Sequence, residues 1–228
     1  MSDIIALHNV SKRFVKKLDA AERVATFVGA DLKDEVVHAV DGVSLSIAAG
    51  EVLGLVGESG CGKSTLGRVV AGIHEASDGT VRFRGKTREE MSAAEAAEAA
   101  LKIQMIFKDP MSALNPRMRV SEIIGEAPRY HKIVPRREMN DYLADLLIRV
   151  GLDPQYAKRY PHQFSGGQRQ RINIARALAV KPDFLVCDES VAALDVSIQA
   201  QVINLFMRLR EDLSLTYLFI SHDLGVVE

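Results

Sequence analysis

The sequence contains very little cysteine and no long hydrophobic run. Its two cysteines, Cys61 and Cys187, are too few for a disulfide framework or a set of metal ligands, and this favours a reducing compartment. No apolar run approaches the roughly 20 residues that a membrane-spanning helix needs, and the N-terminus lacks the charged-then-apolar pattern of a signal peptide. We therefore expect any connection to a membrane to come through a partner.

An excess of charge of one sign is also missing. The chain has 29 Lys and Arg residues against 30 Asp and Glu residues, a formal net charge of -1. This balance disfavours a broad nucleic-acid-binding face, so no nucleic-acid partner is expected. Hydrophobic residues are abundant by contrast. At 47% of 228 residues, they can fill the core of one large domain or two modest ones.

Residues 57–65 fit the phosphate-binding pattern G-x-x-x-x-G-K-S/T, which requires a strand before it and a helix after it. Both requirements are met, because residues 52–56 form a short apolar run and the apolar residues from Leu66 to Ile73 recur at helical spacing. Backbone N–H groups at the helix start would hold phosphate oxygens, and glycines would let the backbone approach them closely. Lys63 would add charge at the β- and γ-phosphates, and Ser64 a hydroxyl ligand for Mg²⁺. The expected nucleotide contacts of this loop are Gly57, Ser59, Gly60, Cys61, Gly62, Lys63, Ser64 and Thr65.

Apolar runs and turn signals predict the remaining elements. Strands are expected over 4–14, 36–47, 80–83, 103–107, 184–189 and 217–220. Helices are expected over 88–101, within 119–160, from Ser165 to before Pro182, and over 198–209. Residues 78–79 predict a turn and residues 108–116 a loop. The charged insert at 15–35 is either a short amphipathic helix or a surface flap, and Phe14 either stacks on adenine or is a plain core aromatic.

Two carboxylates follow the apolar strand at 184–187. Asp188 would hold the water shell of Mg²⁺, and Glu189, facing the other way, would orient and deprotonate the attacking water. His222 follows the next strand and could touch the γ-phosphate. In open α/β sheets ligands bind just beyond the carboxyl ends of strands, where Gly57, Asp188 and His222 all arrive. That placement favours a catalytic role over a solvated turn or an ordinary histidine.

A second anion site is predicted at the start of the helix that follows residue 164. Ser165, Gly166, Gly167 and Gln168 present free backbone N–H groups at the positive end of that helix. Two phosphate sites this far apart in the sequence suggest that two chains face each other across two nucleotides.

These motifs together resemble the nucleotide-binding subunit of ABC transporters. The phosphate loop, the 165–168 segment, the strand ending at Asp188 and Glu189, the 193–195 segment and His222 occur in the family's order. The resemblance implies an α/β fold of the P-loop NTPase (RecA-like) type, with an N-terminal antiparallel β subdomain and an inserted α-helical subdomain. It assigns 1–107 and 167–228 to the ATP-binding core and 108–166 to the helical subdomain, and it implies that the C-terminal part of the family's domain lies beyond residue 228.

Four segments narrow the resemblance to importers of dipeptides and oligopeptides. They are residues 36–43, 109–110, 114–117 and 193–201. The resemblance implies an ATPase that uses ATP and Mg²⁺ and sits peripherally on the cytoplasmic face of the inner membrane. Its implied partners are transmembrane permease subunits, a second ATP-binding subunit in a homo- or heterodimer, and, indirectly, a periplasmic or extracellular peptide-binding protein. In the dimer, Ser165 and Gly167 would cap the γ-phosphate bound by the opposing chain.

Three residues depart from the family's pattern. Lys108 stands where glutamine is usual, Ser190 where proline is usual, and Phe164 where leucine is common. An ammonium offers Mg²⁺ no ligand atom, so we expect Lys108 either to pair with Asp109 or a partner's carboxylate, which we favour, or to reach the γ-phosphate. Lys108→Gln is therefore expected to lower the Mg²⁺ concentration needed for half-maximal ATPase activity.

Two other functions remain open from the sequence. One is an ABC ATPase that acts in a soluble nucleic-acid complex, and this would need a second cassette, a long coiled coil or a basic face. The other is a regulatory cassette that binds ATP but hydrolyses it poorly, and Lys108 favours this alternative.

Overall fold

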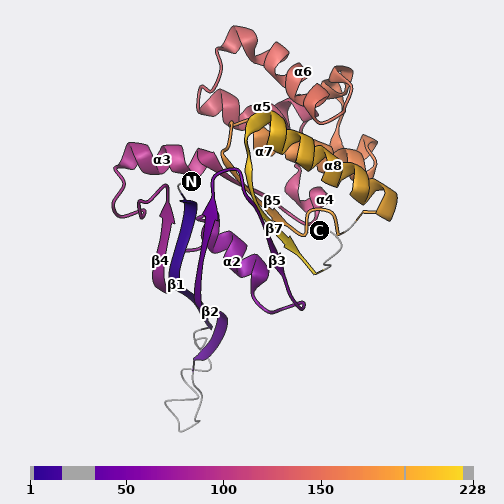
Figure 1. Ribbon diagram of the computed structural model, residues 1–228. Helices are drawn as coiled ribbons and strands as arrows, with labels where there is room; N and C mark the ends of the chain where they lie inside the picture. The colour runs from indigo at the N-terminus through magenta and orange to yellow at the C-terminus, as the bar shows by residue number, and fades with distance from the viewer. Residues whose placement is uncertain (1–2, 17–33, 193, 223–228) are drawn as a thin grey trace, which may run out of the picture.

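The computed structural model describes residues 3–16, 34–192 and 194–222. Two sheets and a group of helices make up this part of the chain (Figure 1). The expected insert at 15–35 lies mostly outside the described residues, as do Ala193 and the residues after His222. Among the described helices, none is both long and apolar enough to cross a membrane.

The antiparallel sheet contains the N-terminal strands. Its order is β2 (Glu35–Ala48), β1 (Asp3–Lys16) and β4 (Asp78–Phe83). The expected strands are confirmed, but β1 runs past Phe14, and the turn expected at 78–79 is the start of β4. Gly79 is needed there because it has φ +81°, and a Cβ atom at this position would lie 2.2 Å from the backbone oxygen of Asn9.

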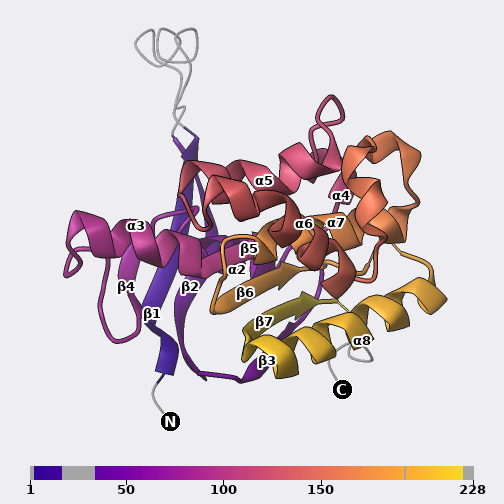
Figure 2. The ribbon, with the colours of Figure 1, turned by 90° about the horizontal axis from the view of Figure 1, so that it is seen from above.

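The second sheet is parallel and has the order β3 (Val52–Val56), β7 (Thr216–Ser221), β6 (Phe184–Asp188) and β5 (Ile103–Ile106). Figure 2 shows these strands side by side. Every residue of β6 and β7 is buried, as expected for central strands covered on both faces. Since all four strands point the same way, their carboxyl ends lie at one edge of the sheet.

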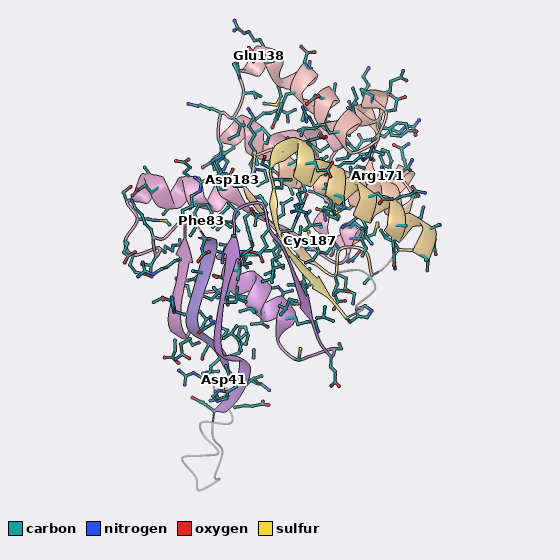
Figure 3. All side chains as sticks on the ribbon, viewed as in Figure 1. Asp41, Phe83, Glu138, Arg171, Asp183 and Cys187 are labelled. Carbon is teal, nitrogen blue, oxygen red and sulfur yellow. The ribbon has the colours of Figure 1, made fainter. Side chains whose placement is uncertain are left out.

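Side chains alternate between the two faces of the parallel sheet and enter two hydrophobic cores. Phe184 and Val186 pack with α2 (Lys63–Val70) and the antiparallel sheet, in the core that also contains Phe83. Leu185 and Cys187 pack on the other face against the helices, and Figure 3 shows Cys187 between the sheet and these helices. The period of two in strands therefore decides which core each residue joins.

The other helices match most of the expected ranges. They are α3 (Ala93–Lys102), α4 (Pro110–Ala113), α5 (Val120–Tyr130), α6 (Met139–Arg149), α7 (Gly166–Leu178) and α8 (Val196–Leu213), with short 3₁₀ turns at Arg136–Glu138, Pro154–Lys158 and Pro161–Gln163. The helix expected from 88 begins only at Ala93, because Ser92 caps it. The loop expected over 108–116 is wrong in part, since it contains α4.

Candidate functional site

The phosphate-binding loop joins β3 to α2, as its pattern requires. Gly60 and Gly62 have φ values of +85° and +96°, which favour glycine. At Gly62 a Cβ atom would lie 1.9 Å from the backbone oxygen of Ala39 in β2, whereas at Gly60 no described atom lies within 4 Å of that position. Gly62 is thus required by a contact inside the protein, and Gly60 lies on the open side of the loop, next to the exposed Ser59 and Cys61.

Lys63 lies inside the curve of this loop. Its side chain is almost fully buried, and Nζ donates hydrogen bonds to the backbone oxygens of Gly57 at 2.7 Å and Glu58 at 2.6 Å. Nζ also lies 3.7 Å from Sγ of Cys61. The loop therefore wraps around a positive charge, next to the free backbone N–H groups at the start of α2. Thr65, half-buried, lies in the first turn of that helix.

One hydrogen bond connects the phosphate loop with the end of β6. The hydroxyl of Ser64 donates to Oδ1 of Asp188 at 2.7 Å, and Asp188 is 5% exposed. These two residues are 124 positions apart in the sequence and meet because β6 lies beside β7, which lies beside β3. A hydroxyl and a carboxylate in contact provide the oxygen atoms that Mg²⁺ prefers.

Glu189 turns out of the strand rather than continuing it. Its φ is +46°, and its backbone N–H donates to the oxygen of Ile220 at 3.0 Å. Its Oε2 accepts a hydrogen bond from Nζ of Lys108 at 2.6 Å and lies 3.5 Å from Nδ1 of His222. The hydrogen bond from Lys108 is the main cause that lowers the pKa of Glu189 below its ordinary value, and burial opposes it.

Both carboxylates line one cavity of about 670 Å³. We expected Glu189 to face away from Asp188, and this stays a prediction, because residues from both faces of the parallel sheet line the cavity. The cavity is lined by Ser64, Arg68, Phe107, Lys108, Asp109, Ser112, Ala113, Arg176, Asp188 and Glu189. The carboxyl ends of β5 and β6 therefore converge with α2, α4 and α7 at this point.

The sequence did not point to Arg68 and Arg176, which bring two guanidinium groups to the cavity. Arg176 donates to the backbone oxygen of Ala113 at the end of α4, and burial lowers its pKa. Arg68 lies in α2, four positions after Ser64, so it shares a helix face with the hydroxyl that contacts Asp188. Helical spacing from Ser64 was the signal that could have identified Arg68.

The pairing that we favoured for Lys108 is also corrected. Asp109 is not its partner, because the Asp109 carboxylate caps α4 by accepting from the backbone N–H groups of Met111 at 2.9 Å and Ser112 at 3.3 Å. These hydrogen bonds lower the pKa of Asp109 and keep its oxygens engaged. Lys108 pairs with Glu189 of its own chain instead.

Phe14 lies on β1 in the antiparallel sheet and is 39% exposed. Its ring makes an edge-to-face contact with His74 at 5.5 Å between centroids, and Nζ of Lys12 lies 5.2 Å from its centroid. It is not a core residue. Stacking of its ring on adenine stays a prediction.

Residues 165–168, the second predicted anion site, form the start of α7. Ser165 caps the helix by accepting from the backbone N–H of Gln168 at 3.3 Å, and the Gln168 side chain accepts from the backbone N–H of Ser165 at 3.1 Å. Ser165 and Gly166 are exposed, while a Cβ atom at Gly167 would lie 2.6 Å from the Ile198 side chain in α8. None of these four residues lines the cavity beside Asp188.

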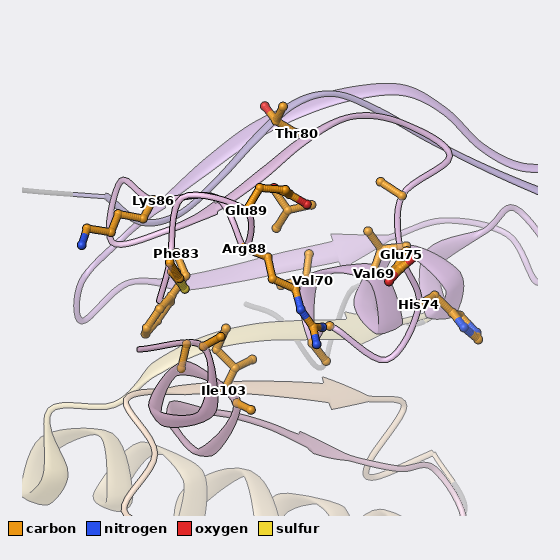
Figure 4. A pocket seen from close by; sticks show the side chains of 18 of the residues that line it. Val69, Val70, His74, Glu75, Thr80, Phe83, Lys86, Arg88, Glu89 and Ile103 are labelled. Atoms are coloured by element: carbon orange, nitrogen blue, oxygen red, sulfur yellow. The ribbon is translucent and has the colours of Figure 1, made fainter. Parts of the chain in front are cut away.

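A second cavity, of about 510 Å³, lies between β4, the end of α2 and α3. Figure 4 shows Arg88 and Phe83 extending toward this space. None of the residues expected to bind nucleotide lines it, so the chemistry concentrates at the first cavity.

Comparison with known sequences identifies close relatives. The family model described as "ABC transporter" matches residues 40–192. The oligopeptide transport ATP-binding protein AppF of Bacillus subtilis is 54% identical over 192 residues, which are 84% of this chain and 58% of AppF. The oligopeptide transport ATP-binding protein OppF of Salmonella typhimurium is 51% identical over 195 residues, 85% of this chain and 58% of OppF. The chain thus spans well under two thirds of the length of these two relatives.

Solved structures agree with the sequence comparison. The dimeric structure of MJ0796, a bacterial ABC transporter cassette, has a TM-score of 0.77 at 26% identity and covers 98% of this chain and 90% of that one. A related structure of MJ0796 is described as a post-hydrolysis state bound to ADP and Pi, with a TM-score of 0.76 and 25% identity. The expected α/β fold is confirmed by these matches and by the two sheets. By its sequence and its fold, the chain belongs to the ABC transporter family.

Proposed function

We propose that the chain is the ATP-binding and ATP-hydrolysing part of an importer for oligopeptides or dipeptides. The observation that carries this proposal is the Ser64–Asp188 hydrogen bond, which joins the phosphate loop to a buried carboxylate beside Glu189. The names of AppF and OppF support oligopeptides as the transported class. Because the chain covers 58% of the length of these relatives, the substrate and the partners are part of this proposal.

The residues at the cavity fit ATP and Mg²⁺. The Ser64 hydroxyl and the Asp188 carboxylate are hard oxygen ligands in contact, and no cluster of three or more metal-ligating His, Cys, Asp or Glu side chains occurs among the described residues. That is the pattern of Mg²⁺ sites that take their other ligands from phosphates and water. Bound there, Mg²⁺ would neutralise phosphate charge. Lys63 and the N–H groups of the loop would bind the phosphates, and Phe14 would stack on adenine.

Glu189 would act as the general base toward the attacking water. It is the carboxylate next to the Ser64–Asp188 pair, its side chain is 13% exposed, and Oε2 lies 3.5 Å from Nδ1 of His222. A base needs to reach the water that it deprotonates, and Glu189 follows β6 at the point where we propose that the phosphates bind. His222 would contact the γ-phosphate from the neighbouring strand end.

The assembly that we propose contains two ATP-binding chains and the permease. The exposed start of α7 supports a contact of Ser165 and Gly167 with the nucleotide of an opposing chain, since the capping box engages the backbone N–H groups of Ser165 and Gln168 and not those of Gly166 and Gly167. The division into a core (1–107 and 167–228) and a helical part (108–166) is part of this proposal. Permease subunits would contact the helical part and hold the protein at the cytoplasmic face of the membrane, and a peptide-binding protein would deliver the substrate.

The ATPase activity of the full-length protein with its permease tests this function. Glu189→Gln should retain ATP binding and lose turnover, because the removed charge acts on water and not on affinity, while Lys63→Ala should weaken binding itself. Glu211→Gln, at an exposed position of α8, is the matched control and should behave as the original protein. Full turnover in Glu189→Gln would refute the assignment of the base.

A further inference from the structure

The ion pair between Lys108 and Glu189 is the closest contact made by the Glu189 carboxylate among the described residues. Nζ and Oε2 are 2.6 Å apart, and the side chains are 58% and 13% exposed. His222 approaches the same oxygen at 3.5 Å. Two nitrogen groups therefore face Oε2, one from the segment after β5 and one from the segment after β7.

The two partners differ in their freedom to move. The Glu189 backbone is fixed by its hydrogen bond to Ile220 and its side chain is mostly enclosed. Lys108 carries its ammonium on a flexible, largely exposed stem, and such a tip is readily hydrated. Breaking the contact therefore means that Lys108 moves out while Glu189 stays.

An ammonium bound to the base opposes the reaction that we propose for it. A base must come within hydrogen-bond reach of the water that it deprotonates, and Oε2 of Glu189 already accepts from the Lys108 ammonium at 2.6 Å and faces Nδ1 of His222 at 3.5 Å.

We propose that Lys108 is a positioning residue that restrains Glu189, and that this restraint must be released before Glu189 can deprotonate water. This inference rests on the proposed function of Glu189 and adds a regulatory contact to it. The restraint is specific to a lysine or arginine at this position, because a neutral glutamine carries no charge to hold the carboxylate.

The contact itself is tested without nucleotide, by thermal unfolding of the full-length protein. Lys108→Met should lower Tm by about 2 °C, because it leaves the enclosed Glu189 carboxylate without its cation. Adding Glu189→Gln should recover most of that shift, since no charge then remains to be paired. Lys102→Met is the control, because Lys102 pairs with Asp183 at 3.3 Å on another part of the chain, and Glu189→Gln should not change its effect. Strictly additive shifts for Lys108 and Glu189 would overturn the proposal.

The effect on hydrolysis is tested in the assembly with the permease. Lys108→Met and Lys108→Gln should raise kcat about threefold or more with little change in the KM for ATP, and Lys108→Arg should keep the original kcat. A fall in kcat for Met and Gln that Arg restores would overturn the proposal, because it would make the cation a requirement for hydrolysis. If the assembly does not hydrolyse ATP while the unfolding shifts are non-additive, the proposed function fails and the restraint on Glu189 is retained.

Discussion

Replacing Gly62 by alanine should damage the phosphate loop through a contact with the antiparallel sheet. The added Cβ atom would lie 1.9 Å from the backbone oxygen of Ala39, and ordinary contact begins at 3.4 Å. Ala39 lies at an irregularity of the β1–β2 register, between the pairs Arg13–His38 and Lys12–Val40. Either this part of β2 or the loop must therefore shift by about 1.5 Å, because backbone atoms cannot rotate away as side-chain tips do.

Three terms determine the size of the effect. A left-handed backbone lowers the free energy of unfolding by about 1–2 kcal/mol when the residue has a Cβ atom. Alanine raises the free energy of unfolding by about 0.4–1 kcal/mol, because it lowers the conformational entropy of the unfolded chain. Overpacking adds about 1–3 kcal/mol. Gly72→Ala separates these terms, since its φ is +71° and no described atom lies within 4 Å of its Cβ position. Gly62→Ala should lose about 2–4 kcal/mol and Gly72→Ala about 1 kcal/mol or less.

Thermal unfolding with and without ATP measures both consequences. At about 2–4 °C per kcal/mol for a chain of this size, Gly62→Ala should unfold about 4–16 °C lower and Gly72→Ala within about 4 °C of the original protein. ATP at about 100 times its Kd should stabilise the original protein and Gly72→Ala by about 2.7 kcal/mol, and Gly62→Ala by much less. Equal shifts for the two variants, or an unchanged response of Gly62→Ala to ATP, would show that the Ala39 contact does not shape the loop.

Two further predictions concern α7 and α6. Ser165→Arg should abolish ATP hydrolysis while each chain still binds ATP, because the blocked site belongs to the opposing chain. Hydrolysis first order in protein and insensitive to this change would indicate a self-sufficient monomer. Tyr142 donates to the backbone oxygen of Ala179 at 2.9 Å, and burial raises its pKa to about 12. The stabilising effect of the neutral Tyr142 side chain should be present below pH 10 and lost as the pH rises through 12. Tyr142→Phe should therefore unfold about 2–4 °C lower at pH 7 and lose stability less steeply than the original protein between pH 10 and 12. An equally steep loss in the variant would exclude Tyr142 as the cause of the alkaline destabilisation.

The positions of the strands could be predicted because their signals are local. The apolar run of β3 ends before Gly57 and that of β6 ends at Asp188, and the parallel arrangement then brings Ser64 and Asp188 together. The short helix α4 was missed because Asp109 and Pro110 also suit a turn. An Asp that caps a helix with Pro at its first position is equally consistent with a helix start, and only the two hydrogen bonds to Asp109 decide.

Packing between elements was harder to read from the sequence. Gly67 looks like a minor helix residue, yet a Cβ atom there would lie 2.6 Å from Cδ1 of Ile220 and 3.1 Å from Cγ1 of Val186. The partner of Lys108 was missed for a related reason. Residues 81 positions apart meet only through the alignment of β5 with β6, and no local pattern records which side-chain conformation a lysine adopts.

The end of β6 places two acidic residues, Asp188 and Glu189, at one cavity. In β6, Phe184 and Val186 face α2, so Asp188 also faces α2 and meets Ser64 there. Continued alternation would send Glu189 to the opposite face, with Leu185 and Cys187, and Ala113 and Arg176 line the cavity from the helices on that face. The left-handed φ of +46° ends the strand where residues from both faces line one cavity. A glycine would adopt this backbone without strain but would bring no carboxylate. A second acidic group at this position therefore costs about 1–3 kcal/mol of backbone strain at Glu189.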